Sequence, residues 1–292
     1  GQRFESIDFR RAKCERAGLG HMANSTQESD LHVLRATIEL LGRGDLPVPQ
    51  KLDSLFEISF ARRLSAVTRR IVPALGETVA EGPFAGMIYG KDIAEGCTVP
   101  KLLGCYEQEL HPALNRAIET DYGAILNIGC AEGYYAVGLA RVLPTAHVFA
   151  WDIDPAAREK TLRNASANGV ADRITVEGAF DAAQFGTYCG QKTLVICDIE
   201  GAEFNLLDPA QSPALAVFDL IVELHPNEDR SVGEFTARFE ATHDVETVQP
   251  EARDPGRFAA LTALPMLDRM FALVERLEAT PWAVLRSKFA IS

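Results

Sequence analysis

The stretch AILNIGCAEGYYAVGLARVLPTAHVFAWDID, residues 124–154, decides the fold. It begins with an apolar run of strand length, Ala124–Ile128, which a glycine-containing turn ends. Apolar residues then recur at helical spacing over Tyr134–Leu143. A second apolar run, His147–Trp151, is followed by Asp152. The stretch therefore predicts a strand, a glycine turn, a helix and a second strand with an acid at its tip.

This order of elements is that of a nucleotide-binding half of a Rossmann-like fold, whose ligand lies at the helix N-terminus. Gly129 permits backbone angles that let the chain turn sharply off the first strand. Gly133 leaves room for a ligand or for close packing between helix and strand. Asp152 is placed to accept hydrogen bonds from both hydroxyls of a ribose.

The residues of the turn favour one class of nucleotide. A dinucleotide-binding turn carries the glycines of G-x-G-x-x-G, but Ala131 replaces the middle one here. Glu132 adds a negative charge where a pyrophosphate would lie, which is unfavourable at close range. S-adenosylmethionine (SAM) combines a ribose with sulfonium and ammonium groups that tolerate nearby acids. The turn, helix and acid together resemble motif I of class I SAM-dependent methyltransferases.

Further stretches resemble a narrower family. The sequence DIEGAE at 198–203 resembles the D-x-E-G-x-E signature of FkbM-type methyltransferases, and IVELHP at 221–226 resembles that family's strand ending in E-x-H. Residues 127–135 resemble its motif I, although Asn127 stands where the family more often has Asp. The resemblance covers about residues 106–226. It implies SAM-dependent O-methylation of a small-molecule or sugar hydroxyl without naming the substrate.

Polar residues follow the expected strands at the edge where ligands of open α/β sheets bind. His225 is the candidate base for the acceptor's proton, because its ordinary pKa is near neutral. Asp198 is expected to contact the methionine part of SAM or to orient the acceptor, and Glu223 to orient His225 or bind the acceptor. Glu200 lies on the same side of an extended chain as Asp198. Glu203 is expected to begin a helix.

The predicted cofactor contacts come from the turn, the strand tips and the segment before the first strand. Phe180 and Asp181 follow the third strand, where class I methyltransferases commonly contact adenine. The complete set is Asn127, Gly129, Cys130, Ala131, Glu132, Gly133, Asp152, Ile153, Phe180, Asp181, Asp198, Tyr106 and Glu107. Three acids near one cleft would suit Mg²⁺ or Ca²⁺. The FkbM-type motifs do not imply a metal, however, and we expect none.

The composition of the chain limits the classes of partner that we expect it to bind. The chain has 292 residues, 47% of them hydrophobic, and a net charge of −12. The acidic balance argues against nucleic acid, which needs a basic surface, and no apolar run approaches the roughly 20 residues that span a bilayer. The six cysteines are scattered without a C-x-x-C pair, as in a cytosolic protein with reduced thiols. We therefore expect a cytoplasmic enzyme acting on a small molecule.

Two domains are expected. Residues 1–100 form a helical extension, with helices at Gln27–Leu41 and Leu52–Val72, that covers the active site or pairs two subunits in a homodimer. Residues 1–21 are interpreted as a tag or leader. Residues 101–292 form a SAM-binding domain: a Rossmann-like, seven-stranded, mostly parallel sheet whose last strand, Trp282–Phe289, is antiparallel. A short strand or hairpin is expected at Gly82–Tyr89.

Three other functions stay open. Motif I binds SAM without choosing which carbon reacts, so the enzyme could cyclise SAM or transfer its aminocarboxypropyl chain, and it would then release methylthioadenosine. A non-catalytic SAM-binding scaffold is the second alternative, against which Asp198, Glu200, Glu223 and His225 together argue. A dinucleotide oxidoreductase is the third.

Overall fold

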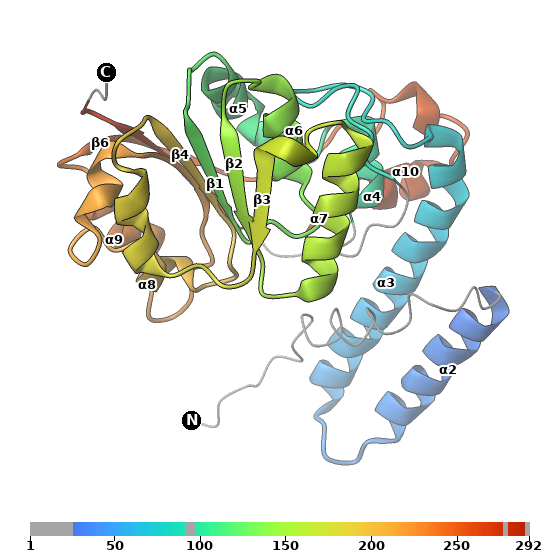
Figure 1. Ribbon diagram of the computed structural model, residues 1–292. Coiled ribbons are helices and arrows are strands. Elements are labelled where there is room, and N and C mark those ends of the chain that lie inside the picture. Colours follow the sequence, from blue (N-terminus) through green and yellow to red (C-terminus); the bar gives the residue numbers. More distant parts are fainter. Residues whose placement is uncertain (1–25, 91–96, 277–279, 290–292) are drawn as a thin grey trace.

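The computed structural model describes residues 26–90, 97–276 and 280–289. At its centre lies a seven-stranded sheet in the order β3-β2-β1-β4-β5-β7-β6 (Figure 1). β7 pairs antiparallel with β5 and β6, whereas the other neighbouring strands are parallel. The strands are β1 (Ala124–Ile128), β2 (His147–Trp151), β3 (Ile174–Glu177), β4 (Thr193–Cys197), β5 (Asp219–Glu223), β6 (His243–Val248) and β7 (Trp282–Ser287). The predicted class I methyltransferase sheet, with its antiparallel last strand, is confirmed.

Helices cover both faces of this sheet, and the two faces have separate cores. Along β1, Ile125 packs into one hydrophobic cluster and Leu126 into the other, because successive side chains of a strand point to opposite faces. β1 and β4 are buried throughout, as expected of central parallel strands. The helices of this body are α4 (Thr98–Leu103), α5 (His111–Ile118), α6 (Tyr134–Val142), α7 (Pro155–Ala167), α8 (Glu203–Leu206), α9 (Val232–Ala237) and α10 (Met266–Ala272); short 3-10 turns lie at Gln108–Leu110, Ala171–Arg173, Ala182–Tyr188, Pro213–Val217 and Ala259–Leu261.

Two glycines of the motif I turn permit close approaches of the backbone. Gly129 has φ +79°, and a Cβ there would lie 1.8 Å from the carbonyl oxygen of Asp198. The turn after β1 is thus packed directly against the turn after β4. Gly133 has φ +85°, and a Cβ there would lie 2.9 Å from Thr161 of α7. Of the two roles expected for Gly133, the structure shows close packing, here between two helices.

The N-terminal part is a helical hairpin of α2 (Thr26–Gly42) and α3 (Val48–Leu75). In Figure 1 it stands clear of the body, except where the end of α3 joins it. Both helices were predicted, although α3 is longer at each end than expected. α4 crosses the domain boundary expected after residue 100.

One local expectation was wrong. Residues 82–89 form turns with a single bridge between Thr78 and Ile88, in place of the expected strand or hairpin. A 3-10 turn at Gln108–Leu110 leads directly into α5. The proposed leader, residues 1–21, lies outside the described residues.

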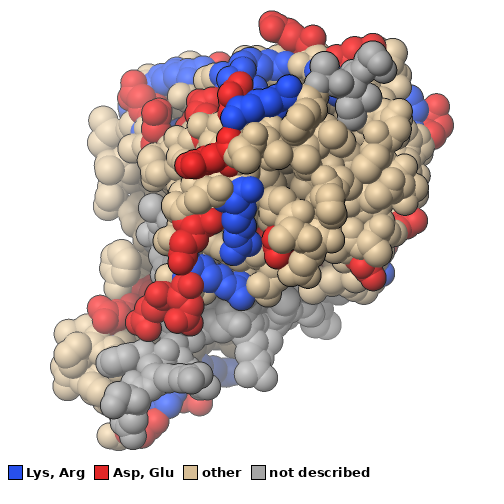
Figure 2. Space-filling view, turned by 90° about the vertical axis from the view of Figure 1, so that its left-hand side faces the viewer, with Lys and Arg blue, Asp and Glu red and all other residues tan. Residues whose placement is uncertain are grey.

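The surface is mixed in charge, and the thiols of the described chain are unpaired with one another. Acidic and basic side chains alternate along a band of the surface (Figure 2). No disulfide joins any two of the described cysteines, which are Cys97, Cys105, Cys130, Cys189 and Cys197. Among the described helices we find none whose length and apolar character would allow it to cross a bilayer.

Candidate functional site

Asp152 lies at the tip of β2 with its carboxylate fixed in place. Its Oδ2 accepts a hydrogen bond from the Ala131 amide at 2.9 Å, and its Oδ1 accepts one from the Asp154 amide at 2.8 Å. Burial raises the pKa of Asp152, although these amides and Arg158 oppose the shift. The motif I turn thus holds the half-buried acid rigidly, and each oxygen keeps capacity for a further hydrogen bond from a ribose hydroxyl.

The residues expected near adenine lie beside this acid. Ile153 follows β2 and is 83% exposed. The ring of Phe180 is only partly buried and lies 4.7 Å from that of Trp151. The Asp181 carboxylate caps the following 3-10 turn by accepting from the Ala183 amide. Ile153 and Phe180 therefore offer apolar surface, whereas Asp181 already has a structural role.

Glu132 was expected to contact the cofactor, but its carboxylate is held by other side chains of the protein. Its side chain is buried and accepts hydrogen bonds at 3.0 Å from both the Tyr89 hydroxyl and the Lys101 ammonium group. Burial alone would raise the pKa of Glu132, but Lys101 and Tyr89 hold it below its usual value. Because Lys101 neutralises this charge inside the core, Glu132 no longer supplies an electrostatic argument against a pyrophosphate. The absence of the middle glycine of G-x-G-x-x-G is still an argument against a dinucleotide.

His225 follows β5 and is oriented by Glu203, at the start of α8. The fully buried carboxylate of Glu203 accepts from the His225 amide at 2.8 Å and lies 3.2 Å from Nδ1. Its other oxygen accepts from the Gly201 amide at 2.7 Å. Glu223 was expected to orient His225 or to bind the acceptor, and its carboxylate contacts Arg276 and Thr280. The contact between Glu203 and Nδ1 leaves Nε2 available for chemistry.

Two acids face Nε2 of His225. Glu200 Oε2 lies 3.3 Å away and Asp198 Oδ1 lies 3.8 Å away. Burial would lower the pKa of His225, but Glu203, Glu223 and Glu200 outweigh it and raise the pKa above its ordinary value. One ligand atom from each of Asp198, Glu200 and His225 lies within 4.8 Å of the others, so these three residues could also hold a divalent cation.

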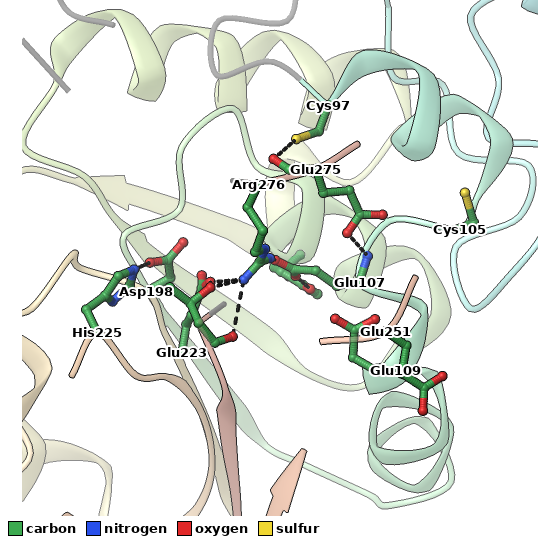
Figure 3. A network of polar contacts seen from close by, with 12 residues as sticks. Cys97, Cys105, Glu107, Glu109, Asp198, Glu223, His225, Glu251, Glu275 and Arg276 are labelled. Carbon is green, nitrogen blue, oxygen red and sulfur yellow. Dashed lines mark hydrogen bonds and ion pairs between the residues drawn. The ribbon is translucent and has the colours of Figure 1, made fainter. Parts of the chain in front are cut away.

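A buried network adjoins Asp198 (Figure 3). Arg276 lies between Glu223 and Glu107 and contacts both, and Glu107 also accepts from the Tyr135 hydroxyl. Burial and the Glu223 carboxylate raise the pKa of Glu107 to about 8, although Arg276 opposes the shift. Glu107, a predicted cofactor contact, is thus held in internal contacts.

Tyr106, the other residue predicted from this segment, packs among aromatic rings. Its ring centroid lies 5.3 Å from that of Tyr134, and Lys101 Nζ lies 4.8 Å from it. The Cys130 side chain, in the motif I turn, is buried near Thr161. Sequence reasoning missed Lys101 and Arg276, because each meets its acid only through the tertiary fold.

The remaining polar groups at this edge fit a cationic ligand. Asn127 Oδ1 and Asp198 Oδ1 are both buried, and neither has a hydrogen-bond partner among the described residues. Burial, with the carboxylates of Glu223 and Glu200, raises the pKa of Asp198 well above its usual value. A group with this shift would be stabilised in its charged form by a nearby cation. The fixed acid Asp152 and these acceptors together suit a ligand that has both a ribose and a positive charge.

A cavity of about 360 Å³ lies elsewhere, at the opposite ends of the strands. It is lined by Tyr122, Lys192 and Asp219 among others, and Asp219 is the first residue of β5. Because ligands of open α/β sheets bind beyond the carboxyl ends, the edge with Asp152 and His225 is the candidate site.

Sequence comparison bears on the same segment. Residues 111–207, about a third of the chain, match the family model described as ribosomal protein L11 methyltransferase (PrmA). This segment contains the motif I turn, Asp152 and the turn after β4, in a sheet with the class I strand order. The chain is a SAM-dependent methyltransferase. A search of curated proteins finds no significant match.

Several solved structures are similar to this chain at low sequence identity. The O-methyltransferase TomG from Streptomyces achromogenes, involved in tomaymycin synthesis and in complex with SAM, is 15% identical, with TM-score 0.41 over 63% of this chain and 82% of its own. An rRNA methylase from Streptococcus thermophilus is 14% identical, with TM-score 0.42 over 61% and 96%. The cofactor-bound Rv0187 from MTB is 15% identical, with TM-score 0.42 over 84% and 99%. At such scores the classification rests on the strand order and the family match.

Proposed function

We propose that this methyltransferase transfers the methyl group of SAM to a hydroxyl of a small molecule, with His225 as the base. The observation that carries the proposal is the environment of His225. Glu203 contacts Nδ1, and Nε2 points toward the acids after β4. An imidazole held in this way can take a proton at one defined atom. The resemblance to FkbM-type motifs and the net charge of −12 support a small-molecule acceptor over nucleic acid.

The residues of the chain then divide the work. SAM, when bound, supplies an electrophilic methyl group. Asp152 and Ile153 would hold the adenosine part of SAM, and Asn127 and Asp198 would accept hydrogen bonds from its ammonium group. Nε2 of His225 takes the proton of the acceptor hydroxyl. Most of the acceleration comes from positioning, because an in-line displacement needs its reacting groups aligned.

A product assay with a panel of hydroxyl-bearing small molecules tests this proposal. We expect S-adenosylhomocysteine as the product, and a fall in turnover of about 10²–10⁴-fold in His225→Ala with the Kd for SAM little changed. Asp152→Asn is the matched comparison, because it should raise the Kd for SAM. Methylthioadenosine as the product would overturn methyl transfer.

The same assay separates a base from a metal ligand. If His225 acts as a base, a chelator leaves turnover unchanged. Loss of turnover with a chelator and its recovery with Mg²⁺ would instead assign His225, Asp198 and Glu200 to a metal centre, since these atoms are close enough to share an ion. Full turnover in His225→Ala would exclude both roles.

A further inference from the structure

The hairpin of α2 and α3 carries an apolar surface that the rest of the described chain leaves uncovered. The end of α3 is anchored, because Val67, Ile71 and Val72 are buried in the core. Farther toward the N-terminus, Arg63 pairs with Asp268 of α10. Beyond this anchor, the first half of α3 and all of α2 project from the body (Figure 1).

On α2 the uncovered residues have the spacing of a coiled-coil seam. Leu31, Leu34, Ile38 and Leu41 are 45% to 62% exposed and follow one another at intervals of three, four and three residues. This is the spacing of the a and d positions in a coiled-coil heptad, which places the side chains in a row along one edge of the helix. The contact with α3 uses a different row, which includes the buried Leu40. The seam is therefore additional to the surface that holds the hairpin together.

A second row of exposed apolar residues lies on α3. Val48, Leu52 and Phe56 recur every four residues and are 58% to 68% exposed. The Asp30–Arg62 ion pair joins the helices along the flank between their shared contact and these rows. Because residues three and four apart share a helix face, both rows open toward the same side of the hairpin. We call these seven residues the hairpin seam.

We propose that the hairpin seam binds the same surface of a second copy of this chain, forming a two-fold dimer. Seven large apolar side chains at these exposures present roughly 800 Å² per chain, about what each partner buries in a standard-size interface. A self-complementary apolar face is what a two-fold contact requires. Two antiparallel helix pairs joined along such seams make a four-helix bundle, whose core consists of a/d-type residues.

The oligomeric state of the full chain tests this inference. Light scattering coupled to gel filtration should give twice the chain mass for the native protein and the chain mass for Ile38→Glu, whose dissociation constant should rise at least about 100-fold. Leu162→Glu is the matched control, because Leu162 is 48% exposed on α7, outside the seam, and that variant should stay dimeric. Circular dichroism confirms that each variant folds.

Hydrogen exchange locates the interface independently of any variant. Amides of residues 30–56 in the native protein should exchange more slowly as protein concentration rises, because association covers them. A monomeric native chain would overturn the inference and would fit a seam covered by residues 1–25 of the same chain. A dimer that persists in Ile38→Glu would place the interface elsewhere and overturn it as well.

Discussion

At the scale of single residues, the hydrogen bond and charge of Glu203 help to raise the pKa of His225. Glu203→Gln keeps the size of the side chain but removes its charge, so the imidazolium loses a stabilising partner. We expect the pKa of His225 to fall, measured by NMR titration of the ring. The acidic limb of the pH profile of turnover should move to lower pH as the pKa of His225 falls.

A matched variant distinguishes this effect from a general loss of negative charge. Glu234, which caps α9 with Ser231, is exposed and serves as the control. Glu234→Gln should leave the His225 titration unchanged. An unchanged titration in Glu203→Gln would mean that Glu200 and Glu223 set the pKa of His225 without Glu203.

The sequence named His225 as the candidate base but did not indicate that Glu203 lies beside its ring. Glu223 is two residues from His225, whereas Glu203 is 22 residues away. The chain brings Glu203 back through a turn in which Glu200 has φ 58° and Gly201 has φ 99°. Sequence spacing alone gave no signal for this turn.

At the scale of elements, α6 depends on a glycine that a helix would ordinarily disfavour. A Cβ at Gly138 would lie 2.5 Å from the Phe84 ring. Alanine is intrinsically a better helix former, by about 1 kcal/mol, but the clash with a buried ring should outweigh that gain. We expect Gly138→Ala to lower the free energy of unfolding by about 1–3 kcal/mol, measured by urea denaturation.

A second helical glycine supplies the control for this prediction. Gly233 lies in α9, and a Cβ there would have no other atom within 4 Å, so alanine should fit. Gly233→Ala should stabilise the protein by up to about 1 kcal/mol. If Gly138→Ala were equally stabilising, Phe84 would have moved aside, and the close contact would not matter.

The sequence predicted the ends of helices and strands correctly where the local apolar pattern was continuous. The bounds of β1 and β2 match the prediction because buried parallel strands are continuous apolar runs ended by polar or glycine residues. Residues 82–89 have no such continuous run. Met87 and Tyr89 are buried there by packing onto the body, and sequence periodicity does not show such contacts.

At the scale of the whole molecule, the candidate site depends on distant segments meeting at one edge. Glu107 precedes β1, Asp198 follows β4, Glu223 ends β5 and Arg276 follows α10. The sequence predicted that strand ends would converge, since this follows from a parallel sheet. It did not predict the partner of Glu223, because Arg276 lies 53 residues away. The fold therefore gathers two carboxyl groups, those of Glu107 and Glu223, around one guanidinium, and it places Asp198 near Glu223.

Because acidic groups outnumber basic groups at the candidate site, we predict that protons are released when SAM binds. The pKa of Asp198 lies well above its usual value, so its carboxyl group retains a proton to higher pH than an ordinary aspartate. A cation brought near it favours the ionised form, which lowers that pKa and releases up to about one proton. Calorimetry near neutral pH in two buffers of different ionisation enthalpy measures the number released.

Asp198→Asn should release fewer protons, because the amide does not titrate. Asp244→Asn, on the exposed end of β6, should match the native protein. Proton uptake, or no release, in the native protein would show that the positive charge of the cofactor lies away from Asp198. The acids around Arg276 would then serve the stability of the fold, and Asp152 alone would remain as the charged contact to the cofactor.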